Sequence, residues 1–369
     1  METLAALEPS PFPVISLYLS LTPNQIGRES YDQFVRKVLS DRAKALPVES
    51  PERESFEKDA ERIRRYLDSE KQQWWRGLAI FACSGAELFE AIPLETPFDD
   101  HWMFVGSSPH LYPLAKLLDT YPRYAAVSLD TNKARIQVFS LAAAERAEQV
   151  VSDKTRRTSK GGWSQARYQR HADNVHLHHM KEVVEALARV VREEKITQIV
   201  IAGDDVAVAR LREQLPGELA DKIIDDLRLQ RNAQDAGFLD ATFDAIRMKD
   251  AETDAEKVAQ LLDEWRSGGL GVAGPEATLS ALELGQVDEL IITGSVESLK
   301  PVQKLPDAAP AKMRADTSAP DTGIDEARLK LSAELIRLAQ QTAARVRFIE
   351  DAGLLEGVGG VGALLRFRL

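Results

Sequence analysis

The chain has 369 residues, of which 44% are hydrophobic and 28% are charged, and its formal net charge is -11. This length predicts two or three domains, each able to bury its own core, and the composition is ordinary for a soluble globular protein. No apolar run approaches the roughly 18–20 residues of a membrane helix. No secretory signal is visible at the amino end, and the single cysteine, Cys83, excludes an internal disulfide. We therefore expect a cytoplasmic protein that makes no membrane contact.

The first 120 residues predict an α/β domain. Alternating apolar residues indicate strands, and apolar residues at helical spacing indicate two charged helices. The expected elements are a strand at 14–21, helices at 28–45 and 51–75, and strands at 77–82, 88–92 and 102–105.

Residues 121–235 predict a second α/β domain. It opens with a two-strand hairpin whose turn contains Asp130, Thr131 and Asn132. A short connector and a basic loop then lead into a long amphipathic helix. The expected elements are strands at 124–129 and 134–140, a helix at 173–193, a strand at 196–202, helices at 206–215 and 219–223, and a strand at 224–229.

Residues 236–369 predict a third α/β unit, interrupted by a Pro- and Ala-rich insertion at 301–321. The fold class is thus three α/β domains in series, at 1–120, 121–235 and 236–369. The expected elements are one or two helices at 238–266, a strand at 270–273, a helix at 278–284, a strand at 289–293, a helix at 324–346, and strands at 346–349 and 363–369.

The basic loop, KTRRTSKGGWSQARYQRH at 154–171, stands out in this acidic chain. From 154 to 170 it has no acidic residue, and the adjacent Gly161 and Gly162 at its centre permit unusual backbone angles and close approach of another chain. These properties suit a loop that reaches into a polyanion, and a solvated surface loop is the alternative. Its six basic residues are Lys154, Arg156, Arg157, Lys160, Arg167 and Arg170.

Two other motifs are better explained by structure than by chemistry. Gly357, Gly359 and Gly362 spell G-x-G-x-x-G, but a dinucleotide site needs a following helix, and the short remainder of the chain is strand-like. Cys83 lies in an apolar strand-like run and is expected to be a small core residue.

Histidines gather at the start of the helix after the basic loop. Asp173, His176, His179 and Glu182 follow one another at steps of three. Such a row is spread over three turns, so it cannot close around one ion without ligands from elsewhere. We expect no metal and no cofactor.

Three strings in the same order resemble the class 1 peptide chain release factors of eukaryotes and archaea and their bacterial relatives. GGWSQAR at 161–167 lies where that family has Gly-Gly-Gln. GVAGPEATLSALELGQV at 271–287 resembles the family's "fGvedTlkALemGAV", and GVGGVGALLRFR at 357–368 resembles "GfGGIGGILRYR". The resemblance spans nearly the whole chain and implies an RNase H-like middle domain and a third domain similar to ribosomal protein L7Ae.

The sequence departs from the family at its two functional motifs. Trp163 stands at the position of the family's glutamine, while Gln165 fits the Gly-x-x-Gln spacing of the ribosome quality-control peptidyl-tRNA hydrolases. The stop-codon string NIKS is missing from 27–46. The string Y-x-C-x-x-x-F survives only in part, as Phe81 and Cys83 followed by Glu87.

The resemblance implies partners and site residues. Gln165, with Gly161 and Gly162, is the catalytic candidate for hydrolysis of the peptidyl-tRNA ester on the ribosome. In the family a translational GTPase docks on the third domain, so it is a candidate partner here. The residues expected to contact ribosomal or transfer RNA are Lys154, Arg156, Arg157, Lys160, Trp163, Ser164, Arg167, Arg170 and His171.

Two functions of different classes remain open. One is a peptidyl-tRNA hydrolase that rescues stalled ribosomes, which Gln165 favours. The other is a non-catalytic hibernation or stress factor that occupies the ribosomal A site, which Trp163 and the missing codon motifs favour. An RNA-binding regulator unrelated to ribosomes is a third, weaker interpretation.

Overall fold

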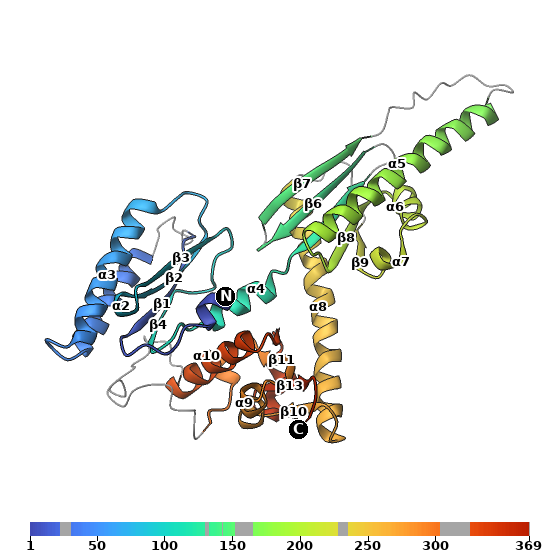
Figure 1. Ribbon diagram of the computed structural model, residues 1–369. Coiled ribbons are helices and arrows are strands. Elements are labelled where there is room, and N and C mark those ends of the chain that lie inside the picture. Colours follow the sequence, from blue (N-terminus) through green and yellow to red (C-terminus); the bar gives the residue numbers. More distant parts are fainter. Residues whose placement is uncertain are drawn as a thin grey trace. The chain divides into compact units, whose positions relative to one another are not determined.

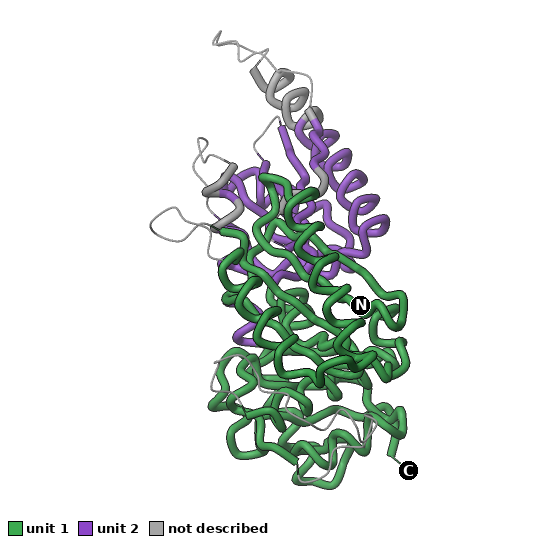
Figure 2. The backbone as a smooth tube through the Cα atoms, turned by 90° about the vertical axis from the view of Figure 1, so that its left-hand side faces the viewer, with its two compact units in different colours: residues 1–120, 253–369 green, residues 121–252 purple. Residues whose placement is uncertain are grey.

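The computed structural model describes residues 1–22, 31–129, 133–141, 143–151, 165–227, 235–302 and 325–368, and for a few of these, including 165–175, only the backbone. The contacts divide the chain into two compact units (Figure 2). Unit 1 combines Met1–Thr120 with Thr253–Leu369, and unit 2 is Tyr121–Glu252. The protein is a mixed α/β protein with three sheets (Figure 1). None of the helices in the described ranges is long and apolar enough to cross a membrane.

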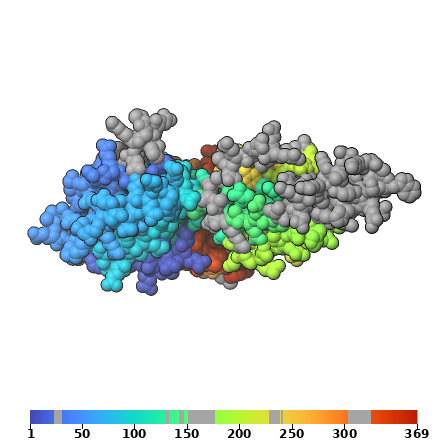
Figure 3. Space-filling view, turned by 90° about the horizontal axis from the view of Figure 1, so that it is seen from above, coloured from blue at the N-terminus to red at the C-terminus, as the bar shows by residue number. Residues whose placement is uncertain are grey.

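The first sheet of unit 1 has the order β3-β2-β1-β4 and is antiparallel throughout. Ile15, Leu17 and Leu19 of β1 alternate onto the face that α2 and α3 cover. Helix α3 starts sharply, because Ser50 accepts a hydrogen bond from the Arg53 amide and Pro51 occupies the first turn. Residues of this part of the chain are blue in the space-filling view (Figure 3). The elements are α1 (Glu2–Ala5), β1 (Val14–Ser20), α2 (Tyr31–Ala45), α3 (Pro51–Glu70), β2 (Gly77–Cys83), η1 (Ser84–Ala86), β3 (Leu88–Leu94), β4 (Trp102–Gly106) and α4 (Tyr112–Thr120).

The other sheet of unit 1 has the order β10-β13-β11-β12. Strand β13 pairs antiparallel with β10 and β11, and β11 pairs parallel with β12. The end of α8 packs on this sheet through Val258 and Leu261. The elements are β10 (Gly271–Ala273), α9 (Pro275–Glu283), β11 (Val287–Thr293), η2 (Val296–Ser298), α10 (Glu326–Gln341), β12 (Arg345–Ile349), η4 (Ala352–Val358) and β13 (Val361–Leu365).

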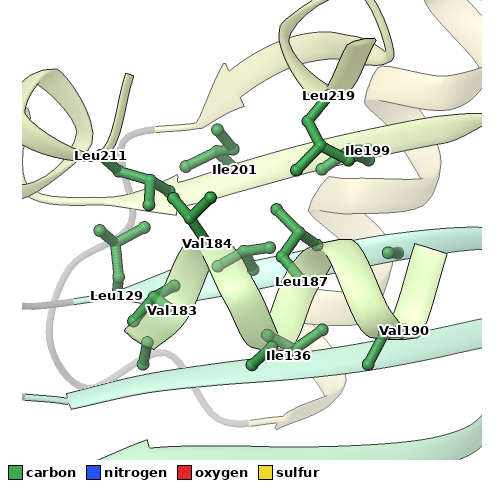
Figure 4. Close-up of a cluster of buried hydrophobic side chains, with 14 of the residues drawn as sticks. Leu129, Ile136, Val183, Val184, Leu187, Val190, Ile199, Ile201, Leu211 and Leu219 are labelled. Carbon is green, nitrogen blue, oxygen red and sulfur yellow. The ribbon is translucent and has the colours of Figure 1, made fainter. Parts of the chain in front are cut away.

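Unit 2 is a three-layer structure around a five-stranded sheet of order β7-β6-β5-β8-β9. The hairpin strands β5, β6 and β7 are antiparallel, whereas β5, β8 and β9 run parallel. Helices α5, α6 and α7 cover one face (Figure 4), and Phe238 and Ile246 of α8 cover the other. The elements are β5 (Tyr124–Leu129), β6 (Lys133–Ser140), β7 (Ala143–Val151), α5 (Gln165–Glu193), β8 (Gln198–Gly203), α6 (Asp205–Arg212), α7 (Gly217–Ala220), β9 (Ile223–Leu227) and α8 (Asp235–Arg266).

Three expectations from the sequence are corrected here. The short connector after 134–140 is a strand, β7, which pairs with β6 from Ala143 to Val151 with one register shift between Val138 and Phe139. The long helix begins at Gln165 and not at 173. The helix expected at 324–346 ends at Gln341, where Thr342 leaves helical geometry and Ala343 takes a positive φ of 52°. The division at 120/121 and 235/236 into three domains stays a prediction, and the insertion at 301–321 lies almost entirely outside the described residues.

Candidate functional site

Most of the predicted site lies outside the described residues, which resume at the start of α5. Lys154, Arg156, Arg157, Lys160, Gly161, Gly162, Trp163 and Ser164 all belong to the undescribed 152–164. Gln165, Arg167, Arg170 and His171 lie within the first two turns of α5. They were expected in a loop and are helical. The signal that sequence reasoning missed is local: 165–193 contains neither glycine nor proline, so nothing interrupts the helix.

Helix α5 carries Gln165 well away from the hydrophobic core of unit 2. Among the α5 residues whose side chains are described, 176–193, the first in that core is Met180, while Leu177 is 42% exposed and His178 is exposed. At 1.5 Å of rise per residue, Gln165 lies about 22 Å from Met180 along the helix axis. Figure 1 shows α5 continuing past the ends of the strands it covers. The amino-terminal half of α5 is therefore a projecting arm, and Gln165 stands at its tip.

The two described residues next to 152–164 are Val151, which ends β7, and Gln165, which begins α5. Both lie toward the end of the sheet where β5, β7 and β8 finish. Strand β7 ends at Val151, which pairs with Lys133 beside the β5–β6 turn. Strand β5 ends at Leu129, which pairs with Gly203 at the end of β8. Helix α5 leads into β8, so its carboxyl end lies at the end of the sheet where β8 begins. Its amino terminus therefore points past the other end of the sheet, where β5, β7 and β8 finish.

An ion pair holds α5 and β7 together below the arm. Arg189 of α5 contacts the carboxylate of Glu148 on β7. The four side chains Val183, Leu187, Val190 and Met180 fasten the same helix to the sheet. This anchoring makes the second half of α5 a rigid base for the arm.

The charge at the tip favours an anionic partner. The first turn of α5 has no acidic residue, and Arg167 and Arg170 follow immediately. A helix amino terminus already carries a partial positive charge, and its first amide groups point outward as free donors. Cations placed there are unfavourable in isolation, so a phosphate or carboxylate that binds the tip relieves this repulsion.

The two residues that match the Y-x-C-x-x-x-F string lie in the core of the first sheet. Phe81 and Cys83 of β2 are both 0% exposed, and the Cys83 thiol lies 3.6 Å from the Ser10 hydroxyl. The expectation that Cys83 is a core residue is confirmed. Neither side chain reaches solvent.

The glycine run near the end of the chain forms a turn. Gly359 and Gly360 have φ values of 77° and 84°, and a Cβ on Gly360 would lie 2.7 Å from the Ser298 carbonyl oxygen. Strand β13 follows directly, so the helix that a dinucleotide site needs is not there. Among the residues that the structure describes, no three His, Cys, Asp or Glu side chains are grouped to hold a metal ion.

Two family models match adjacent parts of the chain. Residues 109–247 match "Bacterial archaeo-eukaryotic release factor family 10", and residues 251–369 match "eRF1 domain 3". Peptide chain release factor subunit 1 of Thermococcus kodakarensis is 24% identical over 84% of this chain and 83% of its own length. The eukaryotic counterpart from Cryptosporidium hominis is 24% identical over 70% of this chain and 67% of its own length. The chain is thus similar, over most of its length, to archaeal and eukaryotic release factors.

Solved structures with similar chains include a translation termination factor, Pelota and Dom34. The archaeal translation termination factor aRF1 is 16% identical, with 98% of this chain and 94% of that chain covered and a TM-score of 0.26. A model of ribosome-bound archaeal Pelota and ABCE1 is 12% identical, with 100% and 93% covered and a TM-score of 0.45. Yeast Dom34, described as a translation termination-like factor that interacts with Hbs1, has 10% identity, 76% and 73% coverage, and a TM-score of 0.41. Because these TM-scores are below 0.5, the fold description rests on the sheet topology.

Proposed function

We propose that this protein acts on the ribosome and hydrolyses the ester of peptidyl-tRNA during rescue of stalled ribosomes. The observation that carries the proposal is the projecting arm: α5 presents Gln165 about 22 Å beyond the core residue Met180. A catalytic group that must reach an ester buried in a larger particle needs such a reach. In this proposal unit 2 contains the RNase H-like middle domain, and the sheet of β10–β13 belongs to a third domain similar to ribosomal protein L7Ae.

Gln165 acts by positioning, not as a strong base. Its side-chain amide orients a water molecule, whose oxygen attacks the ester carbonyl carbon, or its backbone N–H stabilises the oxyanion that forms. The bond to the ribose oxygen then breaks, and that oxygen takes up a proton. The aminoacyl ester is already activated, so a neutral amide suffices. Gly161 and Gly162 allow the backbone to approach the tRNA end closely.

The cationic residues supply affinity for RNA. Arg167 and Arg170 follow Gln165 on the arm, and the others precede it in the basic loop. Contacts between these cations and phosphates release counterions, which makes binding strongly dependent on salt. Trp163 would stack on a base, an interaction worth about 1–3 kcal/mol. The proposed phosphate and polar contacts are Lys154, Arg156, Arg157, Lys160, Ser164, Arg167, Arg170 and His171.

The proposed site of action is the cytoplasm, with the ribosome, rRNA and tRNA as partners. The match of 251–369 to eRF1 domain 3 supports a docking role for that part of the chain. By the resemblance, its partner would be a translational GTPase.

The test compares two glutamines on the same helix. If the side-chain amide positions the reacting groups, Gln165→Ala should lower the rate of peptide release from a ribosome–peptidyl-tRNA complex by about 10²–10³-fold, the size of effect seen when one positioned hydrogen-bonding group is removed. Gln169→Ala, one turn further along α5, should release peptide at the wild-type rate. Both variants should co-sediment with ribosomes like the wild type. Equal release by the Gln165→Ala variant would refute a catalytic role of the Gln165 side chain, because alanine retains only the backbone N–H.

A second function, a non-catalytic occupant of the ribosomal A site, is favoured by Trp163 at the position of the family's glutamine. A hibernation or stress factor of this kind needs the arm and its charge but not Gln165. The same assay separates the two: the wild type would co-sediment with ribosomes and release no peptide with any codon in the A site.

A further inference from the structure

A row of aromatic rings, each in contact with the next, lies in unit 1 where α3 ends and β2 begins. Trp75 is buried and stacks on Tyr66, with ring centroids 5.9 Å apart and an interplanar angle of 21°. Tyr66 meets Phe89 of β3 edge to face at 5.6 Å, and the Arg62 guanidinium lies 4.1 Å from the Phe89 ring centroid. The rings pack against one another and hold this end of the first sheet rigid.

Trp74 is the last ring of this row, and its side chain is 46% exposed. It contacts Trp75 edge to face at a centroid distance of 6.0 Å. Its indole N–H donates a 2.5 Å hydrogen bond to the side-chain oxygen of Gln72. The indole is therefore held in one orientation while a large part of it remains in solvent. A buried or freely rotating tryptophan would not combine these properties.

Cations and neutral amides flank the exposed indole. The turn Lys-Gln-Gln-Trp-Trp-Arg at 71–76 contains no carboxylate, and Gln72, Gln73 and Arg76 are all exposed. The Lys71 ammonium lies 4.6 Å from the Tyr31 ring centroid. The nearest acidic residue in sequence is Glu70, whose charge helps to raise the pKa of Tyr66 after the larger effect of burial.

We propose that this turn is a second RNA contact, in which Trp74 stacks on an unpaired base and Lys71 and Arg76 contact the flanking phosphates. A fixed, half-exposed indole with a lysine three residues before it and an arginine two residues after it matches the way proteins bind single-stranded nucleic acid, where the ring supplies a stacking platform and cations follow the backbone. The Lys71 ammonium also donates to the Tyr31 hydroxyl at 3.3 Å, which holds it on this side of the turn. The amides of Gln72 and Gln73 add hydrogen-bond donors and acceptors for base edges. An apolar protein surface or a lipid would gain little from these charges. The contact rests on its own residues and does not depend on the proposed catalysis.

The experiment measures binding of the full chain to single-stranded oligouridylate. Trp74→Ala should weaken binding about 5- to 150-fold, as expected for loss of one stacked base, and Trp74→Phe should recover part of that loss. Trp265→Ala removes another tryptophan of similar exposure, 45%, at the end of α8, and should leave binding unchanged. The same measurements in an Arg156→Ala, Arg157→Ala, Lys160→Ala background separate this contact from the basic loop, because the Trp74 effect should persist there.

A second probe tests stacking directly. An abasic ribose-phosphate chain of equal length should bind wild type and Trp74→Ala equally, because it offers phosphates without bases. Tryptophan fluorescence, taken as wild type minus Trp74→Phe, should be quenched by oligouridylate and not by the abasic chain. The proposal is overturned if Trp74→Ala, with wild-type thermal unfolding, binds oligouridylate as tightly as the wild type. It is equally overturned if the Trp74 signal responds to phosphatidylcholine vesicles and not to RNA.

Discussion

The hydroxyl of Tyr112 donates a 2.6 Å hydrogen bond to the carbonyl oxygen of Thr293. Tyr112 begins α4, the helix after the first sheet, and Thr293 ends β11 in the β10–β13 sheet. The Tyr112 ring also meets Phe348 of β12 edge to face at 5.1 Å. At the other end of α4, the Asp119 carboxylate accepts a 2.7 Å hydrogen bond from the Phe348 amide. Both ends of α4 are thus fastened to the β10–β13 sheet, although more than a hundred residues separate them in sequence.

Tyr112→Phe should lower the free energy of unfolding of unit 1 by about 1–3 kcal/mol, because the ring stays and the buried Thr293 carbonyl loses its donor. Burial raises the pKa of Tyr112 well above its usual value, so the hydroxyl remains a donor at any working pH. Urea unfolding followed by fluorescence measures the change. Tyr66→Phe is the control, since no hydrogen bond of the Tyr66 hydroxyl is found in the described part of the chain. An equal loss in both variants would count against the role of the Thr293 contact.

A buried histidine makes the stability of unit 1 depend on pH. The Nε2 atom of His110 lies 3.2 Å from the carbonyl oxygen of Leu329 on α10, which can only accept, so Nε2 carries the proton of the neutral ring. Burial lowers the pKa of His110 to about 4, and the hydrogen bond to Leu329 opposes this effect. The ring also stacks on Phe104 at 3.8 Å. Protonation of the ring would place a charge in this buried environment, which is energetically unfavourable.

The sign of the dependence follows from proton binding. Between the unfolded-state pKa near 6.5 and the folded pKa near 4, the unfolded chain binds more protons than the folded one. The His110 contribution is therefore complete above about pH 6.5 and is lost as the pH falls to about 4, a loss of about 3 kcal/mol. Unfolding free energies measured across this window test it. His110→Gln retains a donor toward Leu329 without titrating, so its profile should be flatter than that of the wild type. Parallel profiles would contradict the assignment.

Strong local patterns made most of the fold predictable. In β1, every second residue (Ile15, Leu17 and Leu19) is apolar and faces the core, and α3 has a capping serine before a proline. Both patterns can be recognised in the sequence. Strand β7 was missed because AAERAEQVV has weak β propensity and is a strand only through its pairing with β6. Tertiary context decided that element, and a single sequence does not contain it.

The residues proposed for the site stand out in the sequence, whereas their geometry does not follow from it. The basic composition and the two glycines drew attention to 154–171 without any coordinates. What the residues could not supply is the relation between Gln165 and the core. The apolar stripe that begins near Met180 marks where α5 meets the sheet, but only the sheet shows how far the helix continues beyond it.

The length of the α5 arm should matter for peptide release. Deleting residues 172–178 removes about two turns and about 10 Å, yet nearly preserves the face of the helix toward the core, because seven residues are close to two complete turns. Release should fall to background, while thermal stability stays near the wild-type value because, among the described side chains at 176–193, burial begins at His179 and Met180. Replacing the same residues with strong helix formers of equal length should retain release. Normal release by the shortened protein would show that reach is not what the arm provides.

The basic loop should set the salt dependence of ribosome binding. Replacing Arg156, Arg157 and Lys160 with Ala should weaken binding and reduce the slope of log affinity against log salt by about 2, since each lost phosphate contact removes about 0.7–0.9 from its magnitude. Co-sedimentation at several salt concentrations gives this slope. A control variant loses the same charge at exposed cations already paired with carboxylates, which contribute little to stability. Its slope should equal the wild-type slope, and a fall of similar size would mean that net charge, not the loop, governs binding. The control replaces Lys44, Lys58 and Arg65.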